Sequence, residues 1–279
     1  KDFDKNKPVF TKRFIVVEPL VKIESEVKRS SLPTEMDEFQ QVNAEVFFEG
    51  LTVNNAITDF KLVVYQNFNH NSYAIIKMPD FIGNSTLTYS HKEQLRFQGI
   101  KEFRYFDCKS TRFKAERISN INVNGDEIEF ELITDAPRER FPYRYDEDIN
   151  GKFSIRKQEA FESSNEADYV KVKFTWDYPG RFETENFYIA GAFNGFQALN
   201  PMVLNAETGK FELVLQLKQG FYNYLVGFGK PNQALDFSFT EGSSYETEND
   251  YLIFSYFRKR GQRFYVPVGY RIVNSMNKF

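Results

Sequence analysis

The stretch "YVKVKFTW", residues 169–176, decides the fold class of this chain. Apolar and polar side chains alternate along it, with Val170, Val172, Phe174 and Trp176 on one face and Lys171, Lys173 and Thr175 on the other. A period of two residues predicts a β-strand that buries one face. The same alternation recurs in "QVNAEVFF" (41–48), "EIEFELIT" (127–134) and "GKFELVLQLKQG" (209–220). No segment keeps a 3.6-residue apolar period with caps, so the sequence predicts an all-β protein.

Turn dipeptides separate the predicted strands, at Asn124–Gly125, Asn150–Gly151, Asn194–Gly195 and Thr208–Gly209. Asn-Gly favours a tight hairpin because both central positions of a type I′ turn need a positive φ. Short strands that follow one another through turns, without helices between them, are typical of sandwiches rather than of βαβ units. We therefore expect two consecutive immunoglobulin-like β-sandwich domains.

A polar, acidic segment without periodicity marks the predicted domain boundary. It occupies residues 157–168 of "KQEAFESSNEADYVK" and ends where the strand at Tyr169 begins. We expect a linker here, between one sandwich at residues 19–156 and a second at residues 169–279. Pro19 interrupts two β-like runs, and proline is tolerated at strand starts and edges rather than in a central ladder. Residues 1–18 are therefore expected to be the last strand, or the linker, of a missing N-terminal domain.

Charge and composition limit the possible partners. The 279 residues carry 36 basic and 39 acidic side chains, and the net charge of -3 gives no attraction to nucleic acid or anionic lipid. Two basic clusters, "RFKAER" (112–117) and "FRKRGQR" (257–263), are interpreted as solvated loops or as parts of a protein interface. No run of about 18 apolar residues occurs, so no membrane-spanning segment is predicted. The single cysteine, Cys108, excludes an internal disulfide and is interpreted as a small strand residue.

The segment "DEDINGK" begins like a calcium-binding loop. Asp146, Asp148 and Asn150 supply oxygen atoms at alternate positions before a glycine. The twelfth position of such a loop should be a bidentate glutamate, but it is Lys157 here. We therefore favour a hairpin that turns at Asn150–Gly151 and runs from Tyr143 and Tyr145 back through Phe153 and Ile155, and keep the three residues as calcium candidates.

Catalytic motifs are absent from the sequence. His70 and His91 lie in unrelated polar stretches. There is no nucleophile elbow, no metal-binding H-E-x-x-H and no phosphate-cradling glycine loop. We therefore expect no enzyme activity and no cofactor.

The stretch "YIAGAFNGF", residues 188–196, resembles the opening of glycogen-binding, early-set β-sandwich domains. In such a sandwich a glycine lets the strand bend close to its neighbour. The resemblance implies α-glucan binding as an alternative function, with tryptophans stacked on the sugar. Phe196 stands where those domains usually have tryptophan, and Trp176 is expected in the core. Phe196 is therefore interpreted as part of a vestigial sugar site.

Three further stretches are similar to a narrower family, the plug subunits of the type IX secretion system of Bacteroidota. They are "LVVYQNFNHNSYAI" (62–75), "KEFRYFDCKSTRF" (101–113) and "SSYETENDYLIFSYFRKRGQRFYVPVGYRIVNS" (243–275). The resemblance implies a non-catalytic periplasmic protein that docks on an outer-membrane translocon barrel and closes its periplasmic side. It implies no nucleic-acid partner, no direct membrane insertion and no small-molecule ligand.

Loops rich in Arg, Phe and Tyr are the candidate contacts with that partner, because these residue types anchor protein interfaces. The candidate loops are residues 67–72, 138–145 and 258–264. The candidate contact residues are Asn67, Phe68, Arg138, Tyr143, Arg258, Arg260 and Phe264.

Overall fold

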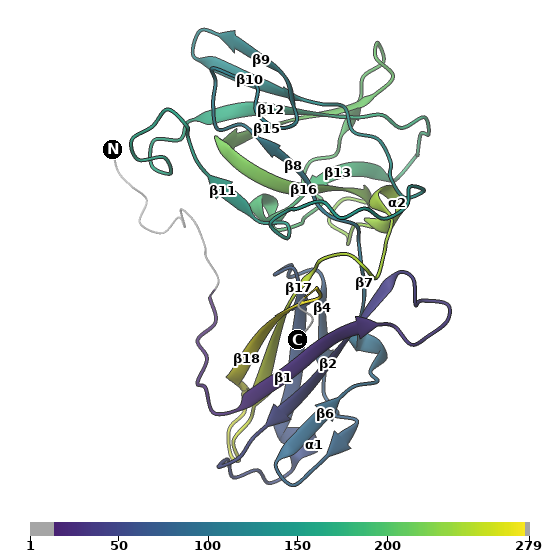
Figure 1. Ribbon diagram of the computed structural model, residues 1–279, viewed down its shortest axis with the longest axis vertical. Helices are drawn as coiled ribbons and strands as arrows, with labels where there is room; N and C mark the ends of the chain where they lie inside the picture. The colour runs from purple at the N-terminus through teal and green to yellow at the C-terminus, as the bar shows by residue number, and fades with distance from the viewer. Residues whose placement is uncertain (1–13, 277–279) are drawn as a thin grey trace.

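The computed structural model describes residues 14–276 and consists of two β-sandwich lobes stacked along the long axis (Figure 1). The chain builds most of the lower lobe, leaves it after β7, builds the whole upper lobe, and returns to add β17 and β18. The upper lobe is thus inserted between two strands of the lower one. The predicted all-β class is confirmed.

Two antiparallel sheets form the lower lobe. One has the order β1-β2-β6-β5, with β7 also pairing with β2, and the other has the order β18-β17-β3-β4. The strands of the first sheet are β1 (Lys22–Arg29), β2 (Phe39–Phe47), β5 (Phe81–Ile82), β6 (Thr86–Tyr89) and β7 (Arg96–Gln98). Those of the second are β3 (Phe60–Gln66), β4 (Tyr73–Ile76), β17 (Asp250–Phe257) and β18 (Val266–Asn274). The short helices are α1 (Ala56–Asp59) and η1 (Glu93–Leu95).

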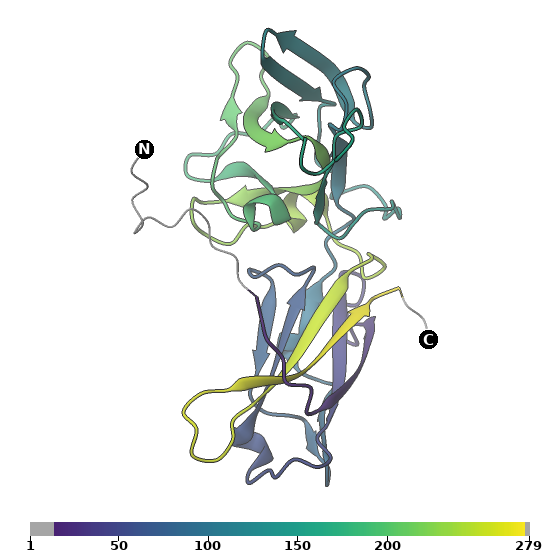
Figure 2. The ribbon, with the colours of Figure 1, turned by 90° about the vertical axis from the view of Figure 1, so that its left-hand side faces the viewer.

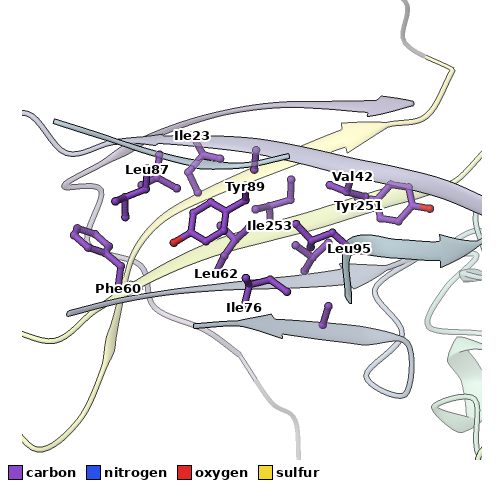
Figure 3. Close-up of a cluster of buried hydrophobic side chains, with 14 of the residues drawn as sticks. Ile23, Val42, Phe60, Leu62, Ile76, Leu87, Tyr89, Leu95, Tyr251 and Ile253 are labelled. Carbon is purple, nitrogen blue, oxygen red and sulfur yellow. The ribbon is translucent and has the colours of Figure 1, made fainter. Parts of the chain in front are cut away.

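The core of the lower lobe lies between these sheets (Figure 3). Val42 and Val46 from one sheet meet Leu62 and Ile253 from the other, and all four are fully buried. Tyr251 is also buried, and its hydroxyl donates a hydrogen bond to Gln40 Oε1 at 2.7 Å. The core therefore joins residues near the start of the chain to residues near its end.

The upper lobe also packs two sheets together. One has the order β14-β15-β12-β10-β9, and in the other β16 pairs with β11, β13 and β8. The bounds are β8 (Arg104–Asp107), β9 (Ile118–Asn124), β10 (Glu127–Leu132), β11 (Phe153–Ile155), β12 (Tyr169–Trp176), β13 (Asn186–Ala190), β14 (Val203–Leu204), β15 (Phe211–Lys218), β16 (Gly220–Gly229), η2 (Ala192–Asn194) and α2 (Ser238–Glu241). The stretch 169–176 forms β12 and buries its apolar face, and Trp176 is fully buried in the core as expected.

The predicted domain boundaries are wrong. Residues 157–168 do not separate two sandwiches, because β10 before them and β12 after them pair side by side in parallel. In the same way β17 pairs with β3, so residues after 249 belong with the first sandwich, not with the one that begins at 169. Alternation identifies a strand but carries no information on a partner almost 200 positions away. The two sandwiches are therefore nested rather than consecutive.

The segment 157–168 is a surface loop of the upper lobe. Its ends are joined by an ion pair between Lys157 Nζ and Asp168 Oδ2 at 2.7 Å. The prediction for residues 1–18 lies largely outside the described residues. Where the chain is described, residues 14–18 form no strand, although the Glu18 amide donates to the Pro267 carbonyl at the edge of β18. Within residues 14–276, no helix is long and apolar enough to cross a membrane.

Two antiparallel chain segments connect the lobes. The Lys101 amide donates to the Gly242 carbonyl at 3.1 Å, and the Ser244 amide donates to the Gly99 carbonyl at 2.7 Å. A Cβ at Gly99 would lie 2.1 Å from the Ser244 carbonyl oxygen, so this close approach requires glycine. The double connection restrains the lobes more than a single linker would.

Candidate docking surface

The outer face of the sheet β18-β17-β3-β4 is apolar and aromatic. We call it the tyrosine face and define it as Val63, Tyr65, Tyr73, Ile75, Leu252, Phe254, Tyr256, Tyr270 and Ile272. These residues alternate with core residues along each strand, so this sheet is apolar on both sides. Tyr73, Ile75, Tyr270 and Ile272 are between 46% and 58% exposed.

Strand pairing brings the rings of the tyrosine face together. Tyr65 lies opposite Tyr73, with ring centroids 5.9 Å apart, and packs edge-on against Phe254 at 6.4 Å. Phe254 lies opposite Tyr270, with centroids 6.4 Å apart. Aromatic pairs of this kind stabilise a sheet. The four exposed residues lie on the outer strands β4 and β18, whereas Val63 and Phe254 between them are 8% and 5% exposed. Exposed apolar side chains gathered on one sheet face are typical of a protein interface.

A basic loop connects β17 to β18 at one end of this sheet. We call residues 258–264 the basic tip. It projects from the lower lobe, near the end that lies away from the upper lobe (Figure 2). Arg260 and Phe264, two of the predicted contact residues, are exposed there, Phe264 by 60%. Arg258 is half-buried, and its guanidinium lies 5.1 Å from the ring centroid of Tyr265.

Asn67 and Phe68, also predicted contacts, lie where the two lobes meet. Asn67 is buried, and its amide nitrogen donates to Asn249 Oδ1 at 2.7 Å. The Phe68 ring lies 4.7 Å below the ammonium of Lys152 from the upper lobe. The Lys152 ammonium also pairs with Asp250 at 3.2 Å. Asn67 therefore bonds within the lower lobe, whereas Phe68, which is 38% exposed, contacts the upper lobe.

Arg138 and Tyr143 hold the connection between the lobes from the upper side. The Arg138 guanidinium donates to the backbone carbonyl of Glu102 and pairs with Glu241 at 2.6 Å. The Tyr143 hydroxyl donates to Glu102 Oε1 at 2.5 Å. Burial raises the pKa of Glu102 to about 7, although the hydrogen bonds from Tyr143 and from the Glu248 amide act in the opposite direction. The titratable carboxyl of Glu102 therefore lies next to the segments that connect the two lobes.

A buried ion cluster lies next to that crossing. Arg104 Nη1 lies 2.7 Å from Asp135 Oδ1, and Arg104 Nη2 lies 2.9 Å from Glu241 Oε2. The Glu241 side chain is fully buried and also accepts from the Val226 amide at 2.8 Å. Burial opposes ionisation of Glu241, but Arg104 and Arg138 outweigh it and lower its pKa. All members of the cluster are paired with one another, so it is a structural network.

Phe196 is not an exposed sugar platform. It is only 6% exposed and packs edge-on against Phe103, with ring centroids 6.1 Å apart. Gly191 behaves as expected from the sequence, because a Cβ there would lie 2.6 Å from the Asn223 carbonyl oxygen. The Asn71 amide nitrogen donates across the lobe boundary to the Phe196 carbonyl at 3.1 Å.

Phe196 and Asn67 line one cavity between the lobes. The cavity has a volume of about 210 Å³. Amide side chains from the lower lobe, including Gln66 and Asn69, face aromatic rings from the upper lobe, including Phe237. The structure thus brings together two residues that the sequence assigned to different functions.

The calcium candidates do not converge on a cation position. Both carboxylate oxygens of Asp148 accept backbone hydrogen bonds at 2.6 Å, one from Phe103 and one from Asn150. Asp146 is exposed. The turn at Asn150–Gly151 forms as predicted, with φ of 52° and 77°, but residues 143–145 form no strand and β11 pairs with β16 instead. The predicted hairpin is therefore wrong in its pairing.

The cysteine and the two histidines lie apart from one another within the described residues. No cluster of three or more His, Cys, Asp or Glu side chains suited to a metal ion occurs within residues 14–276. Cys108 is buried, and burial raises the pKa of its thiol to about 12. His70 packs edge-on against Tyr65, with ring centroids 5.3 Å apart, whereas His91 is exposed elsewhere in the lower lobe.

Sequence reasoning missed the tyrosine face. Its residues come from two parts of the chain, 63–75 and 252–272, that meet only through the pairing of β3 with β17. A local signal does exist, since "DYLIFSYF" (250–257) and "FKLVVYQ" (60–66) are apolar at most positions rather than at alternate ones. Such runs usually indicate a strand buried on both sides.

A solved structure of another protein resembles nearly the whole chain. It is the crystal structure of a hypothetical protein from Parabacteroides merdae, with a TM-score of 0.84 and 28% sequence identity over 92% of this chain. The present chain spans 66% of the length of that protein. No protein-family model matches the sequence, and no curated protein matches it either. The similarity supports the fold.

Proposed function

We propose that this chain is a non-catalytic, periplasmic docking subunit of the plug type, which binds an outer-membrane translocon barrel protein through the tyrosine face. The observation that carries the proposal is the solvent exposure of Tyr73, Ile75, Tyr270 and Ile272 on a rigid sheet. Burying such a face against a partner removes apolar surface from water, and tyrosine does so at a low cost in side-chain entropy.

The two-lobed body suits a docking role. The lobes are joined by two chain crossings and by polar contacts such as the Lys152–Asp250 ion pair, so the tyrosine face is held in a fixed orientation. The packing of Tyr65 on Phe254 and of Phe254 on Tyr270 already orders these rings. The further loss of side-chain entropy when the face binds a partner is therefore small.

The α-glucan alternative has less support. Phe196 is buried against Phe103, and Trp176 is in the core of the upper lobe. Neither ring is exposed for stacking on a sugar. We therefore favour a protein partner over a saccharide.

The test is binding of the purified chain to the translocon barrel protein. We expect the wild-type chain to bind, and a Tyr73→Ser/Tyr270→Ser variant to bind at least about tenfold more weakly, because tyrosine is enriched among the interface residues whose truncation costs about 2 kcal/mol or more. Val123→Ser on β9 is the matched control, since Val123 is 58% exposed on the other lobe. Unchanged binding by the double variant would refute the assignment of the face.

A further inference from the structure

We infer that the partner presents an acidic protein surface opposite the basic tip, so that the tip sets the orientation in which the tyrosine face docks. This inference rests on the proposed docking function and specifies the chemistry of the partner. Its basis is the charge and exposure of residues 258–264 and the ordering of the side chains at their base.

The basic tip concentrates positive charge on a chain that is acidic as a whole. The chain has a net charge of -3, yet the tip carries Arg258, Lys259, Arg260 and Arg263 within six residues. Lys259, Arg260 and Arg263 are exposed, and their side chains have no ion pair or hydrogen bond with any residue in the described range 14–276. Charge of one sign gathered at one end orients a protein as it approaches an oppositely charged partner.

Within residues 14–276, nearby carboxylates do not neutralise the tip. Asp59 ends the helix α1 beside Arg258, but it is buried, and its Oδ2 accepts the backbone amides of Asn54 and Asn55 at 3.2 and 2.9 Å. Glu49, in the connection between β2 and α1, forms no ion pair with the tip in the described residues. The positive charge is therefore available to a partner.

The base of the tip is ordered by cation–π contacts. Lys61 Nζ lies 3.7 Å from the ring centroid of Tyr265, and the Arg258 guanidinium lies 5.1 Å from the same ring. The Tyr265 hydroxyl donates to the Thr58 carbonyl at 2.7 Å, which fixes the ring. Lys61 belongs to β3 and lies opposite Tyr256, so the fixed cations adjoin the tyrosine face. The basic and aromatic surfaces are continuous.

These features favour an acidic protein over an anionic membrane. Membrane attachment by a basic segment needs no fixed geometry and is strengthened by several apolar side chains that enter the interface. Here two cations are held on a ring, and Phe264 is the only large apolar side chain of the basic tip that is strongly exposed. Ordered cations beside an aromatic sheet face are suited to a protein surface with complementary charge.

The experiment measures binding to the purified translocon barrel protein at low and high ionic strength. It compares the wild-type chain, a Lys259→Gln/Arg260→Gln/Arg263→Gln variant, and the control Arg112→Gln/Lys114→Gln. The control removes charges from the other basic cluster noted in the sequence, which lies in the upper lobe. The three substitutions lie in an exposed loop, and equal unfolding temperatures will establish that the variants are folded.

We expect the tip variant to bind at least about tenfold more weakly at low ionic strength and to lose most of its salt dependence, with the control unchanged. Equal affinity and salt dependence for the tip variant would overturn this inference while leaving the docking function in place. Absence of binding by the wild-type chain would overturn both. Stronger binding to phosphatidylglycerol vesicles than to the barrel, lost in the tip variant, would overturn the inference in favour of a membrane.

Discussion

Arg104 Nε lies 3.0 Å from both carboxylate oxygens of Glu241, and the Glu241 side chain has no exposed surface. This pair joins β8 to the helix α2, just before the chain returns to the lower lobe. Because its charges are removed from water, each ion depends on the other for its stability. The pair therefore fixes the upper end of the lobe connection.

Arg104→Met is predicted to lower the free energy of unfolding by about 3–5 kcal/mol, because it leaves a buried carboxylate with one guanidinium fewer. Lys22→Met is the matched control. Lys22 pairs with Glu24 on the surface, where both side chains are more than half exposed, so a loss of no more than about 1 kcal/mol is expected. Urea unfolding followed by circular dichroism measures both. Similar losses for the two variants would contradict the structural role of the buried cluster.

The raised pKa of Glu102 predicts that the stability of the folded chain depends on pH. Burial raises its pKa from 4.5 to about 7 in the folded chain, so between these values the folded state holds a proton that the unfolded state has released. The contribution of Glu102 to stability is then greatest below about pH 4.5 and falls as the pH rises to about 7, by roughly 3 kcal/mol at most. Asp148, whose pKa burial raises to about 6, acts in the same direction.

Glu102→Gln isolates this effect, because the amide keeps an oxygen that can accept from Tyr143 and from the Glu248 amide. We expect the variant to be the less stable chain, or equal, near pH 4.5 and the more stable one above pH 7, when both are measured by urea unfolding across that range. Parallel stability curves for the two chains would show that Glu102 titrates normally.

The nested arrangement of the two sandwiches predicts that the chain stays assembled after a single proteolytic cleavage. Phe161 is fully exposed in the loop 157–168, so limited chymotrypsin treatment is expected to cleave there first. The two fragments should stay together on size exclusion, because β10 pairs with β12 and β17 pairs with β3 across the cut. Separation of the fragments without denaturant would instead indicate two consecutive domains.

The sequence was sufficient to locate the strands but not to predict which strands pair with each other. Alternation identified β12, β10 and β15 because burial of one face leaves a local signature. The pairing of β3 with β17 leaves none, since residues between them build an entire second sandwich. The acidic segment 157–168 resembled a linker because a solvated surface loop and a linker have the same composition.

The sequence was likewise insufficient to predict which of the candidate contact residues face solvent. Arg260 and Phe264 were predicted contacts because of their residue types, and both are exposed in the loop that turns at Gly261, which has a φ of +86°. Arg138 and Tyr143 have the same residue types but are engaged with Glu241 and Glu102, respectively. Only the fold distinguishes an arginine that faces a partner from one that faces a buried carboxylate.

Site-directed cross-linking tests the docking face most directly. Cys108 is buried and its thiol pKa is raised, so a cysteine introduced at the surface is the reactive thiol for a photoactivatable maleimide. Ile272→Cys places the probe on the tyrosine face, where the native side chain is 46% exposed, and Val123→Cys places it on a strand of the upper lobe, where the native side chain is 58% exposed. We predict that illumination in the presence of the translocon barrel protein gives an adduct from Ile272→Cys and little from Val123→Cys. An adduct from Val123→Cys alone, or equal yields from both positions, would contradict the account.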